Sequence, residues 1–268
     1  MRQSGFVSYG AGFAPLAVAH RGGAGLATEN TIEAFARSYA LGIRYLETDV
    51  RLTADGVPVA FHDAGLARVT GRHGQLRRTR YAELDPLIPT LESVLRAFPD
   101  ACFTVDIKDD AAVAPLVEVL HRSGAANRVC VAGAWDGVLA AVAEQAPGTR
   151  TALGWRALTR LVAAGRSGIL RPRAGVPSFA HVPLNLGRLP IFGDSLLARA
   201  HDAGLRVLVW TVDEPSTMHR LLDSGVDGIF TDRPDLLREV LLARAQWVAP
   251  LPIDAEVAKL ARDFERQA

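Results

Sequence analysis

The chain has 268 residues, which is enough for one large α/β domain or two small ones, because α/β barrels often run to about 250 residues undivided. Its 30 basic and 29 acidic residues give a formal net charge of +1, so no strong overall field marks a protein that binds nucleic acid. This balance favours a small or locally charged ligand.

Short apolar runs typical of strands alternate with longer stretches typical of helices, which is the pattern of βα units on a parallel sheet. In chain order the runs are 16–21, 44–52, 57–62, 102–108, 128–133, 151–155, 178–184, 206–212 and 227–231. Only residues 53–56 separate the second run from the third, far fewer than the dozen or so that a parallel crossover needs. These two runs therefore form an antiparallel hairpin with Asp55-Gly56 at its turn. Without the returning arm, eight parallel strands remain, and they predict a (β/α)₈ barrel with a β-hairpin extension after strand 2.

Helix signals lie between the strands. Thr28 or Asn30 is expected to cap a helix that runs to Leu41 and ends at Gly42. Asp194 or Ser195 begins one later helix, and Pro215-Ser216 begins another. Because no repeat, linker or low-complexity segment interrupts the pattern, we predict one domain over 1–268, with a barrel at roughly 14–245 and a polar C-terminal tail at 246–268.

Cysteine usage and the N-terminal composition indicate the compartment. Cys102 and Cys130 each lie inside a strand-like run, so we expect two buried, reduced thiols. Residues 1–19 lack the basic start, long apolar stretch and cleavage site of a secretion signal, and no apolar run reaches ~18 residues. We therefore expect a cytoplasmic protein.

The hairpin also makes a chemical prediction. A turn centred on Asp55-Gly56 would place His62 roughly opposite Asp49, and Glu47 would share a face with Asp49 because strand side chains alternate. The returning arm would bring His62 to these carboxylates at the mouth of the barrel.

His20-Arg21 ends the first strand and is followed by Gly22-Gly23. One interpretation is a catalytic histidine beside an arginine that binds phosphate, with glycines that let the backbone approach the ligand. The alternative is a capping histidine and a surface arginine. The position at the carboxyl end of a barrel strand favours the catalytic interpretation.

Glu47 and Asp49 lie in an otherwise apolar strand, where inward carboxylates are costly unless they are paired or bind a metal. Arg44 lies three and five residues from them and so points to the other face of the sheet, whereas Arg51, four and two residues away, shares their face. Alternation therefore argues against a salt bridge to Arg44, and metal binding is favoured for the inward carboxylates.

Asp106 and Lys108 repeat this spacing in the strand that follows the hairpin. They add a third inward carboxylate and a cation. Three carboxylates and a lysine predict a divalent cation site with a phosphate partner, and ligands that are all oxygen favour Mg²⁺ or Ca²⁺ over zinc.

Six segments in fixed order resemble the glycerophosphodiester phosphodiesterase family along nearly the whole chain: HRGGAGLATENTIEAF, ETDVRLTADGVPVAFHD, IPTLESVL, VDIK, VLVWTVD and GVDGIFTDRPDLL. The resemblance implies a TIM barrel that uses a divalent cation to hydrolyse glycerophosphodiesters to glycerol phosphate and an alcohol. It assigns catalysis to His20 and His62, metal binding to Glu47, Asp49 and Asp106, phosphate binding to Arg21 and Lys108, and a substrate wall to Trp210.

The chain departs from the family pattern at three places. Thr28 replaces a proline, and a threonine can also begin a helix. Asp106 stands where Glu is usual, so its carboxylate is withdrawn by roughly 1.5 Å, one C–C bond. The stretch from Leu66 to Pro89, where longer members carry an insertion over the substrate, is short and basic here, which indicates an open pocket.

The mechanism that this resemblance implies uses both histidines. One removes a proton from the nucleophile and the other protonates the leaving alcohol. The nucleophile is either water or the neighbouring glycerol 2-hydroxyl, which would give a cyclic phosphate that water then opens.

An arginine-rich segment at 150–188 bears on the partner. No acidic residue lies between Glu144 and Asp194, whereas the segment contains Arg150, Arg156, Arg160, Arg166, Arg171, Arg173 and Arg188. Trp155, Leu158, Leu161 and Val162 are interleaved with them. The segment is either a solvated basic helix or a surface for peripheral contact with anionic phospholipid.

Two other functions compete with glycerophosphodiester hydrolysis. A lysophospholipase D or a sphingomyelinase D-like enzyme would keep the chemistry and act on a lipid, which the short insertion and the arginines favour. A non-catalytic barrel that binds phosphorylated metabolites would use the same cations and carboxylates but would not need both histidines.

Overall fold

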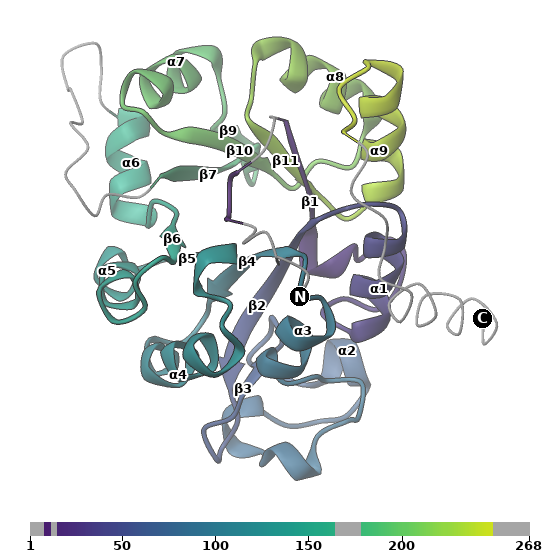
Figure 1. Cartoon of the computed structure of the whole chain (residues 1–268), viewed down its shortest axis with the longest axis vertical. Coiled ribbons are helices and arrows are strands. Elements are labelled where there is room, and N and C mark those ends of the chain that lie inside the picture. The colour runs from purple at the N-terminus through teal and green to yellow at the C-terminus, as the bar shows by residue number, and fades with distance from the viewer. Residues whose placement is uncertain (1–7, 12–14, 164–177, 249–268) are drawn as a thin grey trace, which may run out of the picture.

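A computed structural model describes residues 8–11, 15–163 and 178–248 of the chain. In these ranges eight parallel strands form a nearly closed barrel, which confirms the predicted fold (Figure 1). In chain order they are β1 (Leu16–Ala19), β2 (Tyr45–Leu52), β4 (Cys102–Ile107), β5 (Val129–Gly133), β6 (Arg150–Thr151), β7 (Phe179–Pro183), β10 (Arg206–Trp210) and β11 (Gly228–Thr231). Their order around the barrel is β6-β5-β4-β2-β1-β11-β10-β7. The Leu153 N–H donates to the Phe179 carbonyl at 2.8 Å and so joins the two ends of the sheet.

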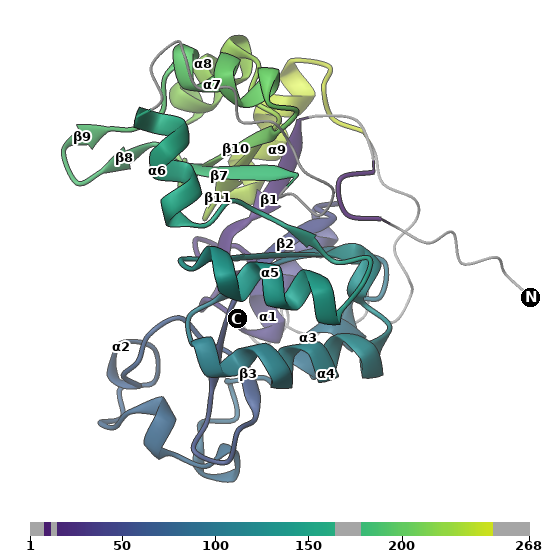
Figure 2. The same cartoon turned by 90° about the vertical axis from the view of Figure 1, so that its left-hand side faces the viewer.

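Each barrel strand is followed by a helix on the outside of the barrel (Figures 1 and 2). These helices are α1 (Ile32–Ala40), α3 (Leu91–Ala97), α4 (Val113–Ser123), α5 (Asp136–Gln145), α6 (Trp155–Ala163), α7 (Asp194–Asp202), α8 (Pro215–Ser224) and α9 (Pro234–Ala243). Short 3₁₀ turns lie at His20–Gly22, Leu76–Arg78, Tyr81–Glu83, Asp110–Ala112 and Ala126–Arg128. The helices α7 and α8 begin at Asp194 and Pro215, as predicted.

The predicted hairpin is confirmed, but its register differs by one residue. Strand β3 (Pro58–Ala60) pairs antiparallel with β2, and Leu52 lies opposite Pro58. The turn is therefore centred on Asp55 instead of on the Asp55-Gly56 bond. The Phe61 N–H donates to the Asp49 carbonyl at 3.0 Å, so Phe61 lies opposite Asp49 and the predicted His62–Asp49 pairing is wrong.

The predicted cap of α1 is also wrong. The cap is Thr31, whose hydroxyl accepts the Ala34 N–H at 3.2 Å. The Asn30 side chain is used elsewhere, as described below. The end of the helix was predicted correctly, since Gly42 follows it in the left-handed region with a φ of 92°.

Residues 66–88 form a small lobe beside β3, with the short helix α2 (Ala67–Thr70) at one edge (Figure 2). Its apolar side chains make a separate core with those of β3, comprising Val59, Phe61, Leu66, Leu76, Leu84 and Ile88. The lobe is therefore packed against the barrel by its own hydrophobic contacts.

Three further expectations concern single features. Cys102 and Cys130 are buried free thiols, as expected. The strand expected at 151–155 is short, because Trp155 already begins α6. A second hairpin, β8 (Asn185–Leu186) with β9 (Leu189–Pro190), was not predicted.

Among the described residues, no helix is long and apolar enough to cross a membrane. The single-domain assignment stays a prediction, since the tail lies outside the described residues from 249 onward.

Phe35 connects α1 to the barrel wall. Its side chain is fully buried, and its ring centroid lies 6.1 Å from that of Phe98 and 6.0 Å from that of Phe103. A Cβ added at Gly22 would come within 2.8 Å of the same ring, so Phe35 also packs under the loop that carries His20.

We expect Phe35→Ala to lower the free energy of unfolding by about 3–5 kcal/mol, because the cavity cannot be refilled by neighbouring strands. Urea denaturation measures this loss. The control is Leu242→Ala, at a side chain that is 46% exposed on α9, which should change stability by less than about 0.5 kcal/mol. A loss below about 1 kcal/mol for Phe35→Ala would contradict this account of the packing.

Candidate active site

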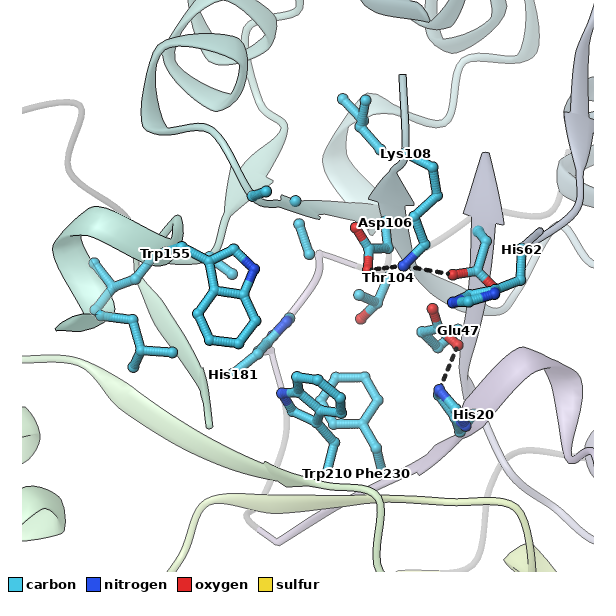
Figure 3. A pocket seen from close by; sticks show the side chains of 18 of the residues that line it. His20, Glu47, His62, Thr104, Asp106, Lys108, Trp155, His181, Trp210 and Phe230 are labelled. Carbon is cyan, nitrogen blue, oxygen red and sulfur yellow. Dashed lines mark hydrogen bonds and ion pairs between the residues drawn. The ribbon is translucent and has the colours of Figure 1, made fainter. Parts of the chain in front are cut away.

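A pocket opens at the carboxyl ends of the barrel strands (Figure 3). The structure brings all of the predicted site residues together in its lining, namely His20, Arg21, Glu47, Asp49, His62, Asp106, Lys108 and Trp210. They come from the ends of β1, β2, β4 and β10 and from the segment after β3. This is the end of a parallel barrel at which the loops can converge on one ligand.

Asp49 is the most heavily paired carboxylate of the pocket. The Lys108 Nζ lies 3.0 Å from its Oδ1 and 2.6 Å from the Asp106 Oδ2, so one ammonium bridges two strands. The Arg21 Nε lies 3.5 Å from the Asp49 Oδ2. Although burial opposes its charge, Lys108 and Arg21 lower the pKa of Asp49, so the carboxylate is ionised.

Asn30 holds Asp49 from the side opposite Lys108. Its Nδ2 donates to the Asp49 Oδ2 at 2.9 Å, and its Oδ1 accepts the Thr48 hydroxyl at 2.7 Å. Asn30 adopts a left-handed backbone with a φ of 57°, a conformation that asparagine tolerates better than most residues. The conformation and the two bonds explain why this residue does not cap α1.

Glu47 is buried without a lysine or arginine partner among the described side chains. It accepts the Arg21 backbone N–H at 2.6 Å, and its Oε2 lies 3.9 Å from the His20 Nε2. Burial and the nearby Asp49 carboxylate raise the pKa of Glu47 to about 7. Arg21 has a φ of 49°, and this left-handed backbone accompanies the bond from its N–H to Glu47.

His20 is oriented by Asp232, a residue that the sequence analysis missed. The His20 Nδ1 donates to the Asp232 Oδ1 at 2.7 Å, which leaves Nε2 on the side of Glu47. Burial lowers the pKa of His20, but the Glu47 and Asp232 carboxylates more than offset this and raise it. Its place directly after the last strand, β11, was the one available signal for Asp232.

His62 has a matching partner next to it in the chain. Its Nδ1 donates to the Asp63 Oδ1 at 2.7 Å, and the Arg68 Nε donates to the Asp63 Oδ2 at 2.6 Å. The two terminal nitrogens of Arg68 donate to Glu29, each at 2.7 Å. Glu29 in turn accepts the Arg21 Nη1 at 3.0 Å. Arg68, from the 66–88 lobe, therefore connects the supports of His62 and Arg21.

The other half of the pocket is aromatic and apolar (Figure 3). Trp155, His181, Trp210 and Phe230 face the charged residues across the cavity. Burial lowers the pKa of His181 to about 3, so its ring is neutral, and it packs on the Phe230 ring at a centroid distance of 4.8 Å. The sequence analysis used neither Trp155 nor His181 as a site residue, because each lies in a segment that reads equally well as core.

The divalent cation implied by the family resemblance can be tested against these side chains. No three His, Cys, Asp or Glu side chains in the described ranges are spaced as a ready metal site. Glu47 and Asp49 nevertheless offer a suitable set, since both are buried carboxylates and Glu47 has no strong cation beside it. Asp106 can offer the same ion its Oδ1, since the Lys108 Nζ bonds only to its Oδ2.

Comparison with known proteins decides the family. Residues 20–236 match the model of the glycerophosphoryl diester phosphodiesterase family. The chain belongs to this family. It is an enzyme of that activity, a glycerophosphodiester phosphodiesterase.

Individual relatives agree with this assignment. The chain is 39% identical over 247 residues to a protein of Mycobacterium tuberculosis named probable glycerophosphodiester phosphodiesterase 2, with 87% of this chain and 92% of that protein covered. It is 23% identical to human lysophospholipase D over 267 residues, which cover 84% of this chain and 85% of the relative. A phosphodiesterase from Oleispira antarctica, solved with its product sn-glycerol-3-phosphate, has the same fold, with a TM-score of 0.71, 23% identity, and 85% of this chain and 97% of that chain covered.

Arg68 of the 66–88 lobe can be tested as a residue that positions Asp63 and Glu29. We expect Arg68→Ala to lower kcat for a soluble phosphodiester by roughly tenfold to a hundredfold, because Asp63 and Glu29 lose the group that holds both in place. Arg68→Lys should recover only part of this, since an ammonium cannot bond as a fork to Glu29. Steady-state kinetics give the values, and thermal melting checks that each variant is folded.

Arg72→Ala is the matched control, because it removes the same charge from the same lobe, and the one side-chain bond found for Arg72 in the described residues goes to the Glu83 carbonyl. It should change kcat less than twofold. Equal losses in the Arg68 and Arg72 variants would mean that net charge, and not the connection to Asp63 and Glu29, is responsible.

Proposed function

We propose that the enzyme hydrolyses glycerophosphodiesters to glycerol phosphate and an alcohol by acid–base catalysis with His20 and His62. The observation that carries the proposal is that each histidine donates from Nδ1 to an aspartate, Asp232 or Asp63, at 2.7 Å. Because an ionised carboxylate only accepts hydrogen bonds, each imidazole is fixed in one tautomer, and its Nε2 is left for proton transfer.

The two histidines would act on opposite sides of one phosphate. One Nε2 accepts the proton of the attacking hydroxyl or water, and the other donates a proton to the oxygen of the leaving alcohol. The leaving alcohol must be protonated, since an alkoxide is a poor leaving group at neutral pH. After this step the base is protonated and the acid is not. If a cyclic phosphate has formed, its opening by water reverses both transfers, whereas after direct attack by water the two histidines exchange protons with solvent.

Arg21 and Lys108 are proposed to bind the phosphate. Both line the pocket, and both already lie beside carboxylates that limit their motion. Arg21 is held by Glu29 and can present its remaining N–H groups to two phosphate oxygens. Trp210 is proposed as an apolar wall for the substrate at the opposite side of the pocket.

Glu47, Asp49 and Asp106 are proposed to hold a divalent cation, Mg²⁺ or Ca²⁺. Such an ion supplies positive charge to a non-bridging phosphate oxygen and stabilises the charge that develops during transfer. Support comes from the raised pKa of Glu47, near 7, which burial and Asp49 cause and which a nearby cation would reverse. Asp106 would offer such an ion its Oδ1, since Lys108 bonds only to its Oδ2.

The non-catalytic alternative is wrong, since the chain is an enzyme of the family. A barrel that only binds phosphorylated metabolites would need Arg21 and Lys108, but it would not need two histidines that are each fixed by an aspartate. The lysophospholipase D alternative keeps the same chemistry, and the surface next to the pocket bears on it below.

We expect His20→Ala and His62→Ala each to lower kcat for glycerophosphocholine by roughly 10²–10⁴-fold, the range for loss of one acid–base group. His73→Ala, at an exposed histidine of the 66–88 lobe, is the control and should retain full turnover. Product glycerol phosphate is measured by a coupled assay. A His20 or His62 variant with more than a tenth of the wild-type kcat would contradict the assignment of that histidine as general acid or base.

Metal removal tests the carboxylates. Dialysis against a chelator should reduce turnover to background, and titration with Mg²⁺ or Ca²⁺ should restore it. Asp106→Asn should raise the metal concentration for half-maximal activity by about tenfold, because a neutral amide replaces one anionic ligand. Asp110→Asn, at an exposed acid nearby, should leave this concentration unchanged. Full activity in the chelator would refute the metal assignment.

A further inference from the structure

Exposed apolar side chains gather beside the mouth of the pocket. The large apolar residues that are well exposed in the described ranges are Leu87, Trp135, Trp155, Val162, Leu186, Leu189, Leu242 and Val248. Five of these eight, from Trp135 to Leu189, lie on the segments that follow β5, β6 and β7. Single exposed apolar residues are ordinary, but a cluster on one edge marks a contact surface.

The β8–β9 hairpin is the most exposed part of this edge. Leu186 is 57% exposed and Leu189 62% exposed, and the two are paired directly opposite each other across the hairpin. Residues opposite each other in an antiparallel pair share a face, so both leucines point the same way. Among the described strands, β8 and β9 pair only with each other. Neither leucine therefore contributes to the barrel core.

The hairpin continues the apolar wall of the pocket. It follows β7 directly, and the Leu184 N–H donates to the Trp210 carbonyl at 2.8 Å, which fixes the base of the hairpin to a pocket residue. Trp135 and Trp155 belong both to the pocket lining and to the exposed set. In Figure 2 the hairpin stands out from the same side of the barrel as the 66–88 lobe. The base of the hairpin is thus attached to the aromatic wall of the pocket, and two tryptophans of that wall are themselves exposed.

On α6 and the β8–β9 hairpin this edge carries basic and no acidic side chains, whereas Asp136 follows Trp135 on the α5 side. Residues 145–193 contain no aspartate or glutamate. Arg156 and Arg160 on α6 and Arg188 at the hairpin turn are exposed, whereas Arg166, Arg171 and Arg173 lie outside the described residues. Apolar side chains flanked by arginines match a surface whose anionic headgroups lie above an apolar layer.

We propose that Trp135, Trp155, Leu186 and Leu189 form a lipid-contact rim that docks the enzyme on an anionic phospholipid surface. The leucines would enter the boundary between headgroups and acyl chains, and Arg188 would pair with lipid phosphates. Resting on the proposed function, the rim would deliver monoacyl glycerophosphodiesters from that surface to the pocket. In the reaction, water oxygen bonds to phosphorus, the bond from phosphorus to the headgroup alcohol breaks, and this alcohol takes up the proton.

Vesicle binding tests the rim directly. The wild-type chain is sedimented with vesicles of phosphatidylcholine alone or of equal parts phosphatidylglycerol and phosphatidylcholine. The double variant Leu186→Ser/Leu189→Ser should bind the anionic vesicles at least tenfold more weakly than wild type. Its matched control, Leu87→Ser/Leu242→Ser, removes two leucines that are 50% and 46% exposed elsewhere and should bind as wild type does. Arg188→Glu should also weaken binding, and wild-type binding should fall as salt rises.

Assays with a soluble substrate and a membrane-bound substrate distinguish loss of lipid docking from loss of catalysis. Turnover of glycerophosphocholine, which is water-soluble, should stay within twofold in all these variants. Hydrolysis of lysophosphatidylethanolamine in anionic vesicles should fall about tenfold in the hairpin variants only. Wild-type protein that turns over glycerophosphocholine but ignores anionic vesicles would overturn the rim alone, whereas failure on both substrates would overturn the proposed function.

The competing occupant is a second copy of the chain. If wild-type protein is a dimer by light scattering and the hairpin double variant is a monomer, the leucines serve association and the lipid proposal is wrong. A wild-type monomer that binds the vesicles supports it.

Discussion

Two buried carboxylates on β2 are the constraint on which the rest of the site depends. Glu47 and Asp49 lie inside the barrel, where an unpaired charge is costly, so the surrounding chain must supply compensation. Lys108 and Arg21 provide it for Asp49, together with the Asn30 amide. Glu47 receives only a backbone N–H and a distant imidazole, and its raised pKa reflects this deficit. The proposed cation would compensate the negative charge of Glu47.

The hairpin and the 66–88 lobe give this charged centre its second histidine. The returning strand carries the chain back to the pocket, where His62 meets Asp63 and, through it, Arg68. Arg68 also holds Glu29, which supports Arg21, so one guanidinium stabilises groups from both sides of the proposed phosphate site. A lobe that lies outside the barrel is therefore part of the hydrogen-bond network around the proposed catalytic residues.

The pocket has a charged wall and an aromatic wall. The charged wall suits a phosphodiester, which every substrate of the family shares. The aromatic wall, with Trp155 and Trp210, faces it, and Trp155 is itself exposed and is followed by the exposed Arg156. The charged side chains thus come from the ends of β1, β2 and β4 and the segment after β3, and the aromatic ones from β7, β10, β11 and the start of α6. Such a division allows the second wall to change without loss of the first.

The sequence by itself determined the eight barrel strands, the hairpin and eight of the residues that line the pocket, because periodicity, turn length and strand ends are local properties. It placed Glu47 and Asp49 on one face correctly for the same reason. Only the tertiary structure decided which groups bond to which. The His20–Asp232 bond joins residues 212 positions apart, and it forms only because β1 and β11 become neighbours when the barrel closes. Packing between elements also set the hairpin register, which differs by one residue from the prediction and so changes the residue opposite Asp49. It likewise led Asn30 to bond to Asp49 instead of capping a helix. Local sequence patterns do not encode such packing.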